Sequence, residues 1–540
     1  MNSFLTLDWA IVGFYFLILL GIVWWAVRQK QESTADYFLA GRHVGWFVIG
    51  ASIFASNIGS EHIVGLAGIA AKSGVVMGHY ELHSWLVLLL GWVFVPFYMR
   101  SKVFTMPEFL EKRYSPKTRW LLSVISLVGY VLTKVSVTVY AGAVVFQTLM
   151  GIDFWTGALI VVILTGVYTV LGGLRAVIYT ETLQTIVLIA GSVTITVIGL
   201  IKIGGWSNLV SIAGLDHFNL FLPANHPDFP WTGMIFAPPI VGLWYWCTDQ
   251  YIVQRTLAAR NEKQARRGTI FAAYLKLLPF FIFIIPGVIA YALSKTGQLT
   301  LQEADQAFPT LVKTLLPTGI RGLVAGGLLA ALMSSLAAVF NSCSTLFTID
   351  IYKKLKPDSS EKTLVRVGRI ATGAVVISGV LWIPFMKYIS GELYHYLQSV
   401  QAYIAPPIAA VFLLGLFFKR INAQGALTAM VSGFVLGMGR LVLEINKENL
   451  SGWLYKFASI NFLHFCIFLF LFCIILMIVV SLLSPAPSNE KIKGLTYATT
   501  VAADKAASRA SWNYKDVILS IAILIMLAMI LVYFSRLFFS

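Results

Sequence analysis

The residues best placed to do chemistry are ionisable side chains that lie inside strongly apolar stretches of the 540-residue chain. They are Glu61, His62, His79, Glu81, His83, Lys134, Glu181, Asp249 and Lys276. A charged group in such a stretch is costly, and it persists where it binds a ligand or pairs with an opposite charge. Two interpretations stay open at this point: a polar binding site, or ion pairs that hold a helical bundle together.

Four polar residues within these stretches have the mixture of groups that a polyhydroxylated solute needs. They are Asn57, Glu81, Lys276 and Gln398. Together they supply hydrogen-bond donors and acceptors, and the hydroxyls of a sugar both donate and accept. The aromatic run Trp244-Tyr245-Trp246 follows Gly242 in mid-stretch, which favours a stacking surface and gate over an interfacial belt.

A run of small and hydroxylated residues at 330–335 is a second kind of candidate site. Small residues allow helices to pack closely. Paired hydroxyls, with carbonyls freed by a broken helix, also bind a hard cation such as sodium without any net protein charge. The sequence permits both interpretations of Ser334 and Ser335.

Two apolar stretches, 50–68 and 236–250, contain features that predict broken helices. The first has the polar run 56–62 at its centre, and the second has Pro238, Pro239 and Gly242 near its middle. In lipid, a break leaves carbonyls unpaired unless they line a cavity or bind an ion. The breaks are five stretches apart, which predicts a five-plus-five inverted repeat with a binding site near the midplane.

The elements that would position these residues are membrane-spanning helices. The chain is 58% hydrophobic and 12% charged, with a mean hydropathy of +0.80, which is typical of a polytopic membrane protein. Apolar runs of about 20 residues predict an all-α protein with about fourteen spans. The runs lie at 8–27, 45–70, 75–99, 119–149, 154–172, 175–201, 231–254, 268–294, 320–350, 365–386, 393–418, 423–445, 459–483 and 513–537.

The distribution of basic residues orients these predicted spans. With the N-terminus outside, 28 of the 40 Lys and Arg residues fall in inside loops and 10 fall outside. Cytoplasmic loops are enriched in Lys and Arg, so both termini are predicted to be extracytoplasmic in a plasma (inner) membrane. The formal net charge of +16 then follows from topology, with the lipid bilayer rather than nucleic acid as the partner.

Long stretches of the sequence resemble the sodium:solute symporter family, in its sodium/glucose cotransporter subgroup. They are FASNIGSEHIVGLAG at 54–68, GWVFVPFYMRSKVFTMPEFLEKRY at 91–114, YTVLGGLRAVIYTETLQT at 168–185, LWYWCTDQYIVQRTLAA at 243–259, LMSSLAAVFNSCSTLFTIDIY at 332–352 and YLQSVQAYIAPPIAAVFLLGLFFKR at 396–420. The resemblance covers roughly residues 9–483.

The resemblance implies a LeuT-like core of ten helices, with one helix before it and three after. The corresponding domains are an N-terminal helix and loop at 1–44, inverted repeats at 45–230 and 231–445, and peripheral helices at 446–540. The polar segment 484–515 is predicted to be a cytoplasmic linker.

The resemblance also implies roles for individual residues. Sodium would bind backbone oxygens of Ala55, Ile58 and Ala331 and the hydroxyls of Ser334 and Ser335. Sugar would bind Asn57, His62, Glu81, Ser84, Lys276 and Gln398. Tyr245, beside Trp246, would cap the sugar on the cytoplasmic side, and Leu66, Tyr80 and Tyr394 would close the outer side.

The sequence departs from the family pattern at three places. Glu181 stands near the sodium exit path where the family usually has Asp. Gly242 replaces a polar residue that contacts sugar in other members. Ala337 and Ala338 lack the hydroxyls of a second sodium site, which predicts one sodium per sugar.

The leading hypothesis is sodium-coupled symport of a glucose- or galactose-type sugar by alternating access. The alternatives are symport of another polyol such as myo-inositol, symport of a nucleoside, and a non-transporting sugar sensor. An enzyme is disfavoured because the sequence shows no nucleophile–base set, phosphate loop or metal cluster.

Overall fold

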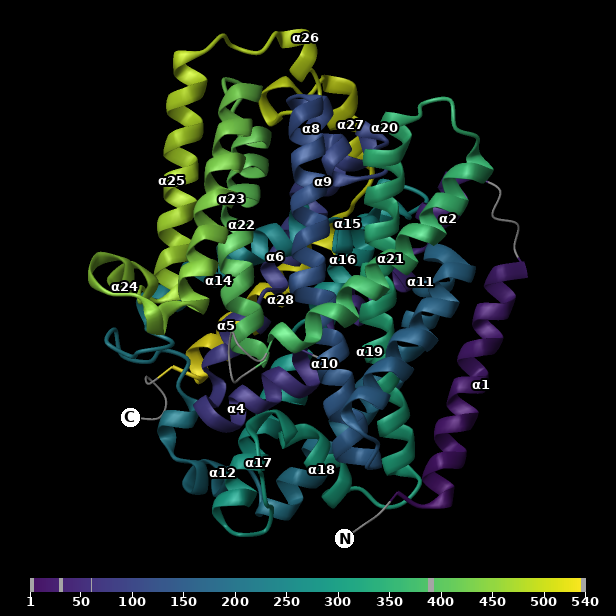
Figure 1. Ribbon diagram of the computed structural model, residues 1–540, viewed down its shortest axis with the longest axis vertical. Helices are drawn as coiled ribbons and strands as arrows, with labels where there is room; N and C mark the ends of the chain where they lie inside the picture. Colours follow the sequence, from purple (N-terminus) through teal and green to yellow (C-terminus); the bar gives the residue numbers. More distant parts are fainter. Residues whose placement is uncertain (1–3, 29–32, 60, 387–392, 536–540) are drawn as a thin grey trace.

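The computed structural model describes residues 4–28, 33–59, 61–386 and 393–535, and these are almost entirely helical (Figure 1). Ser60, in the first predicted break, lies outside the described residues. The first helices are α1 (Thr6–Arg28), α2 (Thr34–Leu39), α3 (Trp46–Asn57), α4 (Ala67–Ser73), α5 (Gly78–Glu81), α6 (Ser84–Leu89), α7 (Val95–Ser101), α8 (Met106–Arg113), α9 (Pro116–Tyr130), α10 (Ser136–Val145), α11 (Phe154–Ile203), α12 (Trp206–Ala213) and α13 (Trp231–Met234).

The second half of the chain continues in the same way. Its helices are α14 (Ala237–Gly242), α15 (Gln250–Leu257), α16 (Glu262–Leu275), α17 (Ile285–Lys295), α18 (Ala307–Leu315), α19 (Ile320–Thr345), α20 (Lys353–Leu355), α21 (Glu361–Met386), α22 (Leu393–Phe417), α23 (Ala423–Ile445), α24 (Gly452–Ala458), α25 (Phe462–Leu483), α26 (Asn489–Ile492), α27 (Ala502–Ala510) and α28 (Tyr514–Tyr533). Short π-helical segments join several of them, among them η2 (Glu61–Leu66), η5 (Val131–Val135) and η8 (Leu243–Thr248).

Apart from the breaks described below, the predicted apolar stretches are mostly helical over the residues that the structure describes. Among the described residues, ten helical segments are long and apolar enough to cross a membrane. Helix α3 and the segment Phe154–Val167 are shorter apolar helices. The all-α membrane class is therefore confirmed, while the count of fourteen spans stays a prediction.

The predicted spans 154–172 and 175–201 are two helices that meet at a sharp kink and together carry the label α11. The kink is at Gly173, with φ 56° and ψ −160°. A Cβ on Gly173 would stand 2.8 Å from the backbone oxygen of Tyr37. Glycine is required here because the backbone is left-handed and because it closely approaches α2.

The loops group at two ends of the bundle, as the charge pattern predicts. Figure 1 shows α8, α20, α26 and α27 at one end and α12, α17 and α18 at the other. The first group contains or adjoins loops that are predicted to be cytoplasmic. The assignment of that end to the cytoplasm stays a prediction from charge.

The first break lies where the sequence predicts it. Helix α3 ends at Asn57, Ile58 is extended with φ −79° and ψ 93°, and η2 begins at Glu61. The N–H of Ile58 donates to the carbonyl of Phe54 at 2.8 Å. The carbonyls that follow Phe54, beginning with that of Ala55, lie beyond this last helical bond, and such carbonyls need another partner.

The second break lies elsewhere than the sequence predicts. Pro238 and Pro239 are in the first turn of α14, where a missing N–H costs little. The helix continues through Gly242 and η8, and the interruption is at Asp249, with φ −81° and ψ 131°. The prediction of a break near Pro238, Pro239 and Gly242 is therefore wrong, although Asp249 falls within the stretch 236–250.

Candidate functional site

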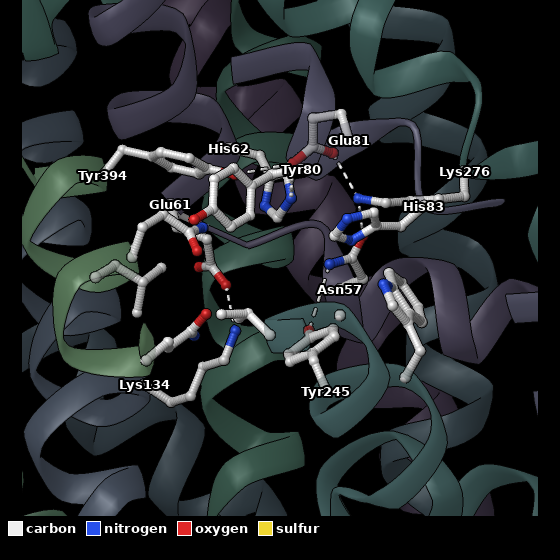
Figure 2. A pocket seen from close by; sticks show the side chains of 16 residues that line it. Asn57, Glu61, His62, Tyr80, Glu81, His83, Lys134, Tyr245, Lys276 and Tyr394 are labelled. Carbon is white, nitrogen blue, oxygen red and sulfur yellow. Dashed lines mark hydrogen bonds and ion pairs between the residues drawn. The ribbon is translucent and has the colours of Figure 1, made fainter. Parts of the chain in front are cut away.

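A small cavity lies between the two broken helices and α22 (Figure 2). Its volume is about 40 Å³, measured as space open to the centre of a water molecule. Seven of the eight predicted substrate-binding residues line it: Asn57, His62, Glu81, Tyr245, Trp246, Lys276 and Gln398. The predicted gate residues Tyr80 and Tyr394 line it as well.

Glu81 is the centre of the hydrogen-bond network in this cavity. Nζ of Lys276 lies 2.5 Å from its Oε2, and Nε2 of His62 lies 3.2 Å from its Oε1. The hydroxyl of Tyr394 donates to Oε1 at 3.0 Å. Lys276 also donates to Oδ1 of Asn57 at 2.9 Å. These contacts join α5, α22 and the C-terminus of α16 to the first break.

Asn57 connects the first break to the second broken helix. It is the last residue of α3, and its Nδ2 donates to the hydroxyl of Tyr245 in η8 at 3.3 Å. The ring of Tyr245 packs edge-on against Trp246, with centroids 5.0 Å apart. Nζ of Lys276 lies 5.3 Å from the ring centroid of Trp246, which is within cation–π range.

A second ion pair lines the cavity, formed by two residues that the sequence analysis did not assign to the site. Nζ of Lys134 in η5 lies 2.8 Å from Oε1 of Glu61, and these residues are 4% and 1% exposed. The Lys134 ammonium is also 4.6 Å from the ring centroid of Tyr245. Two features of the sequence could have indicated that this pair belongs to the site: Lys134 lies within an apolar stretch, and Glu61 stands beside His62 in the first break.

Of the residues predicted to bind substrate or form gates, Ser84 and Leu66 do not line the cavity. Ser84 is fully buried in the first turn of α6, and its Oγ has no hydrogen-bond partner among the described residues. Leu66 is buried at the end of η2. By contrast, the predicted gate rings of Tyr80 and Tyr394 meet edge-on, with centroids 6.5 Å apart.

The position of Gly242 has a physical explanation in the neighbouring side chain of His83. A Cβ on Gly242 would stand 2.7 Å from Nδ1 and Cε1 of His83. His83 is 4% exposed, lines the cavity, and its Nε2 has no partner among the described residues. The imidazole thus fills the space that a side chain at position 242 would need.

Of the residues predicted to bind sodium, Ser335 lies where α19 passes the first break, the break that also contains Ile58. Ser334 and Ser335 are 0% and 2% exposed, and neither hydroxyl has a hydrogen-bond partner among the described residues. A Cβ on Gly59 would stand 2.4 Å from Oγ of Ser335, so this hydroxyl touches the break. Ala331 precedes the two serines by one helical turn and therefore shares their face. This donor set of neutral oxygens suits a hard monovalent cation.

Glu181 does not line the cavity. In α11, it lies behind the first break, where its Oε1 is 3.0 Å from Nη2 of Arg255 and accepts a hydrogen bond from Ser56 at 2.9 Å. Its Oε2 accepts from the hydroxyl of Ser52. The carboxylate thus ties α11 to α3 and α15, and its predicted role on a sodium exit path stays a prediction.

Helices α3 and α15, each one half of a broken helix, are joined near both of their ends. The hydroxyl of Tyr251 donates to the carbonyl of Ser56. Near the ends of the helices, the N–H of Val44 donates to the carbonyl of Ala258 at 3.1 Å, and the N–H of Arg260 donates back to Val44 at 3.3 Å. These two halves are therefore one packed unit.

The fold is that of a known class of membrane transporter. A solved structure of a Na⁺-coupled sialic acid symporter in a substrate-bound outward-open state aligns with a TM-score of 0.77. It is 23% identical, and the alignment covers 89% of this chain and 98% of that one. At this identity, the likeness establishes the shared fold.

Sequence comparison then gives the family. The sodium:solute symporter family pattern matches residues 37–433. Sodium/glucose cotransporter 1 of Oryctolagus cuniculus is 39% identical over 525 residues, which cover 89% of this chain and 79% of the relative. Sodium/myo-inositol cotransporter 2 of Homo sapiens is 40% identical over 534 residues, which cover 91% and 79%. The chain belongs to the sodium:solute symporter family.

Membership confirms three of the predictions made from sequence. The protein is a multi-pass membrane symporter, it is not an enzyme, and sodium is the ion it co-transports. Sodium is therefore cargo of this protein rather than a resident cofactor.

Proposed function

We propose that the protein couples inward sodium movement to uptake of a neutral monosaccharide of the glucose or galactose type, with one sodium per sugar. The observation that carries this proposal is the charge balance of the cavity. Its two carboxylates, Glu61 and Glu81, are each paired with a lysine of the same cavity. The wall is therefore rich in donors and acceptors without net charge, which suits a neutral solute with many hydroxyls.

The proposed substrate site is contracted in this structure. A volume of about 40 Å³ holds only a few water molecules and is smaller than a sugar. Tyr80, Tyr394 and Tyr245 line the cavity, and they would act as its gates, the first two on the outer side and Tyr245 on the cytoplasmic side. Admission of a solute then requires one of these gates to move, as alternating access demands, and Leu66 would contribute to the outer gate.

Sodium would couple to the sugar through the first break. The carbonyls of Ala55, Ile58 and Ala331 and the hydroxyls of Ser334 and Ser335 would hold α3 against α19. Asn57 lies between Ala55 and Ile58 in sequence, so the same backbone places a sugar-binding amide. Ligands that prefer the same conformation raise each other's affinity.

The membrane potential supplies part of the driving force. One elementary charge crossing 100 mV releases about 2.3 kcal/mol. Since 1.36 kcal/mol corresponds to a tenfold change, one sodium per sugar supports roughly fifty-fold accumulation from this term alone.

The main alternative substrate is myo-inositol, another neutral ring polyol. Sodium/myo-inositol cotransporter 2 is as similar to this chain as sodium/glucose cotransporter 1, at 40% against 39% identity. The imidazole of His83, which occupies the space beside Gly242, is the group we expect to set the preference among ring hydroxyls. Ser84 would contribute only after the cavity opens.

The predicted topology belongs to the same proposal. It has fourteen spans in a plasma (inner) membrane, inverted repeats at 45–230 and 231–445, and both termini extracytoplasmic. Glu181 would influence sodium release through its contacts with Ser52 and Ser56.

Uptake into proteoliposomes tests this function. Labelled glucose is supplied with an inward sodium gradient, and unlabelled galactose, myo-inositol and uridine compete in separate reactions. We expect sodium-dependent uptake that galactose suppresses most strongly. Stronger suppression by myo-inositol would establish the alternative polyol, suppression by uridine a nucleoside carrier, and saturable binding without uptake a sensor.

A further inference from the structure

The carboxylate of Glu61 faces both proposed sites. Its Oε1 accepts a hydrogen bond from Nζ of Lys134 inside the substrate cavity, at 2.8 Å (Figure 2). Its Oε2 lies toward the first break: a Cβ built on Gly59 would stand 2.5 Å from this oxygen and 2.4 Å from Oγ of Ser335. Because both oxygens are this close to one point, they are at most about twice that distance apart.

The hydroxyl that Glu61 approaches belongs to the proposed sodium site. Ser335 is 2% exposed, and its Oγ has no hydrogen-bond partner among the described residues. Hard cations hold oxygen ligands at roughly 2.0–2.6 Å. Two oxygens separated by up to about twice that distance can therefore bind one ion, which puts the Glu61 carboxylate within reach of an ion at Ser335.

We propose that Glu61 is shared between the two sites, with Oε2 as an additional ligand of the sodium ion and Oε1 as the partner of Lys134. This inference rests on the proposed function, because it takes the cavity as the substrate site and α19 as the sodium site. It adds an anionic ligand to a site whose other proposed ligands are neutral.

The shared carboxylate gives a physical route for coupling. Sodium brings a second positive charge to a carboxylate that Lys134 already holds. In a buried site of low effective dielectric, the two cations compete strongly for one anion. Sodium binding then weakens the hold of Glu61 on Lys134, and the Lys134 ammonium becomes available to a solute hydroxyl. Linkage requires that the solute raise sodium affinity by the same factor.

Glu81, the other carboxylate of the cavity, differs from Glu61 in the groups that it contacts. The oxygens of Glu81 contact Lys276, His62 and Tyr394, all of which line the cavity. Figure 2 shows the Glu81–Lys276 pair on one side of the cavity and the Glu61–Lys134 pair on the other. Of the two, Glu61 is the one that lies against Ser335.

A purely structural role for Glu61 makes a different prediction. If its carboxylate only neutralises Lys134, a single substitution leaves a buried unpaired lysine and damages the protein. Removing both charges together would then restore normal behaviour, sodium binding included. The double variant therefore separates the two roles.

The experiment uses purified full-length protein in detergent, without any solute. NaCl is titrated against choline chloride at constant ionic strength, and the unfolding temperature is followed, because an ion that binds the folded state raises it. We expect Glu61→Gln, and equally Glu61→Gln with Lys134→Gln, to need roughly tenfold more sodium for half of the maximal effect. Glu448→Gln, an exposed carboxylate in the loop after α23, is the matched control with a wild-type response.

A wild-type sodium response in the double variant would overturn the proposal, because Glu61 would then act only as the counter-ion of Lys134. Should the double variant not fold, Glu61→Asp is the alternative, because it keeps the negative charge but moves the carboxylate away from Ser335. A wild-type sodium response in Glu61→Asp would also overturn the proposal. Since the assay contains no sugar, a sodium response without glucose uptake would remove the substrate assignment and leave the role of Glu61 standing.

Discussion

Two of the clusters of buried charge among the described residues, one in the cavity and one behind the first break, differ in the atoms that surround them. In the cavity, the Glu81–Lys276 and Glu61–Lys134 pairs face polar atoms that have no partner among the described residues, such as His62 Nδ1 and Gln398 Oε1. Behind the first break, both oxygens of Glu181 accept hydrogen bonds from neighbouring helices.

The comparison shows that burial of charge does not by itself mark a binding site. The Glu181 cluster holds α3, α11 and α15 together and does not line the cavity. The cavity pairs also hold helices together, but they lie beside spare donors and acceptors that a solute can satisfy. Spare hydrogen-bonding capacity next to a paired charge is thus the more informative sign.

We expect the largest effect from substitution of Arg255, the cation of the Glu181 cluster. Arg255→Met leaves Glu181 buried without its cation, and breaking a buried pair costs about 3–5 kcal/mol. We expect a large fall in unfolding temperature, measured in detergent by tryptophan fluorescence. A variant with wild-type stability would show that the Glu181 cluster does not hold α3, α11 and α15 together.

Substitution of Lys276 is the matching change in the cavity. Lys276→Ala removes a donor to Glu81 and Asn57, but His62 and Tyr394 still contact Glu81. We expect sugar KM to rise by about a hundredfold, close to 2.7 kcal/mol, with a smaller loss of stability than in Arg255→Met. Uptake kinetics at saturating sodium measure the effect, and an unchanged KM would contradict the site assignment.

Ser335→Ala separates the ion from the solute. The Ser335 hydroxyl has no hydrogen-bond partner among the described residues, so its removal should cost little stability. We expect the sodium concentration for half-maximal uptake to rise by about tenfold, close to 1.4 kcal/mol, with sugar KM restored at high sodium. Equal sodium dependence in variant and wild type would show that Ser335 is not a sodium ligand.

Gly242→Ala should give the smallest effect, and it tests whether His83 sets the preference among ring polyols. The added Cβ would meet the ring of His83 at 2.7 Å and Cδ1 of Leu86 at 2.5 Å, so these side chains must shift. We expect a change of a few-fold, about 1 kcal/mol, in the ratio of glucose to myo-inositol uptake. An unchanged ratio would mean that His83 does not read the ring hydroxyls.

Sequence reasoning found most of the cavity because ionisable residues in apolar stretches are rare. Asn57, Glu81, Lys276 and Gln398 were identified from residue type, and they converge. For Glu61 and Lys134 the sequence leaves both interpretations open, a binding site or a structural ion pair, because it cannot show that two residues pair or that their pair lines a cavity. The closeness of Glu61 to Ser335 depends on how α19 passes the break, and local pattern does not contain that information.

The second break shows a different limit. Proline and glycine near the middle of a stretch predict an interruption, but Pro238 and Pro239 occupy a first helical turn that tolerates them. The interruption at Asp249 carries no proline or glycine. Its carboxylate accepts a hydrogen bond from the hydroxyl of Tyr130 on α9. Tertiary contacts, rather than local propensity, set this break.

Sodium-coupled symport requires that the sodium gradient drive glucose uphill, and concentrative uptake measures this. Proteoliposomes containing the protein receive labelled glucose, first with an inward sodium gradient and an inside-negative potential, and then with potassium in place of sodium. We expect internal glucose to exceed the external concentration only with sodium, and a sodium ionophore to abolish the excess. Glucose that reaches the same level with and without sodium would contradict it.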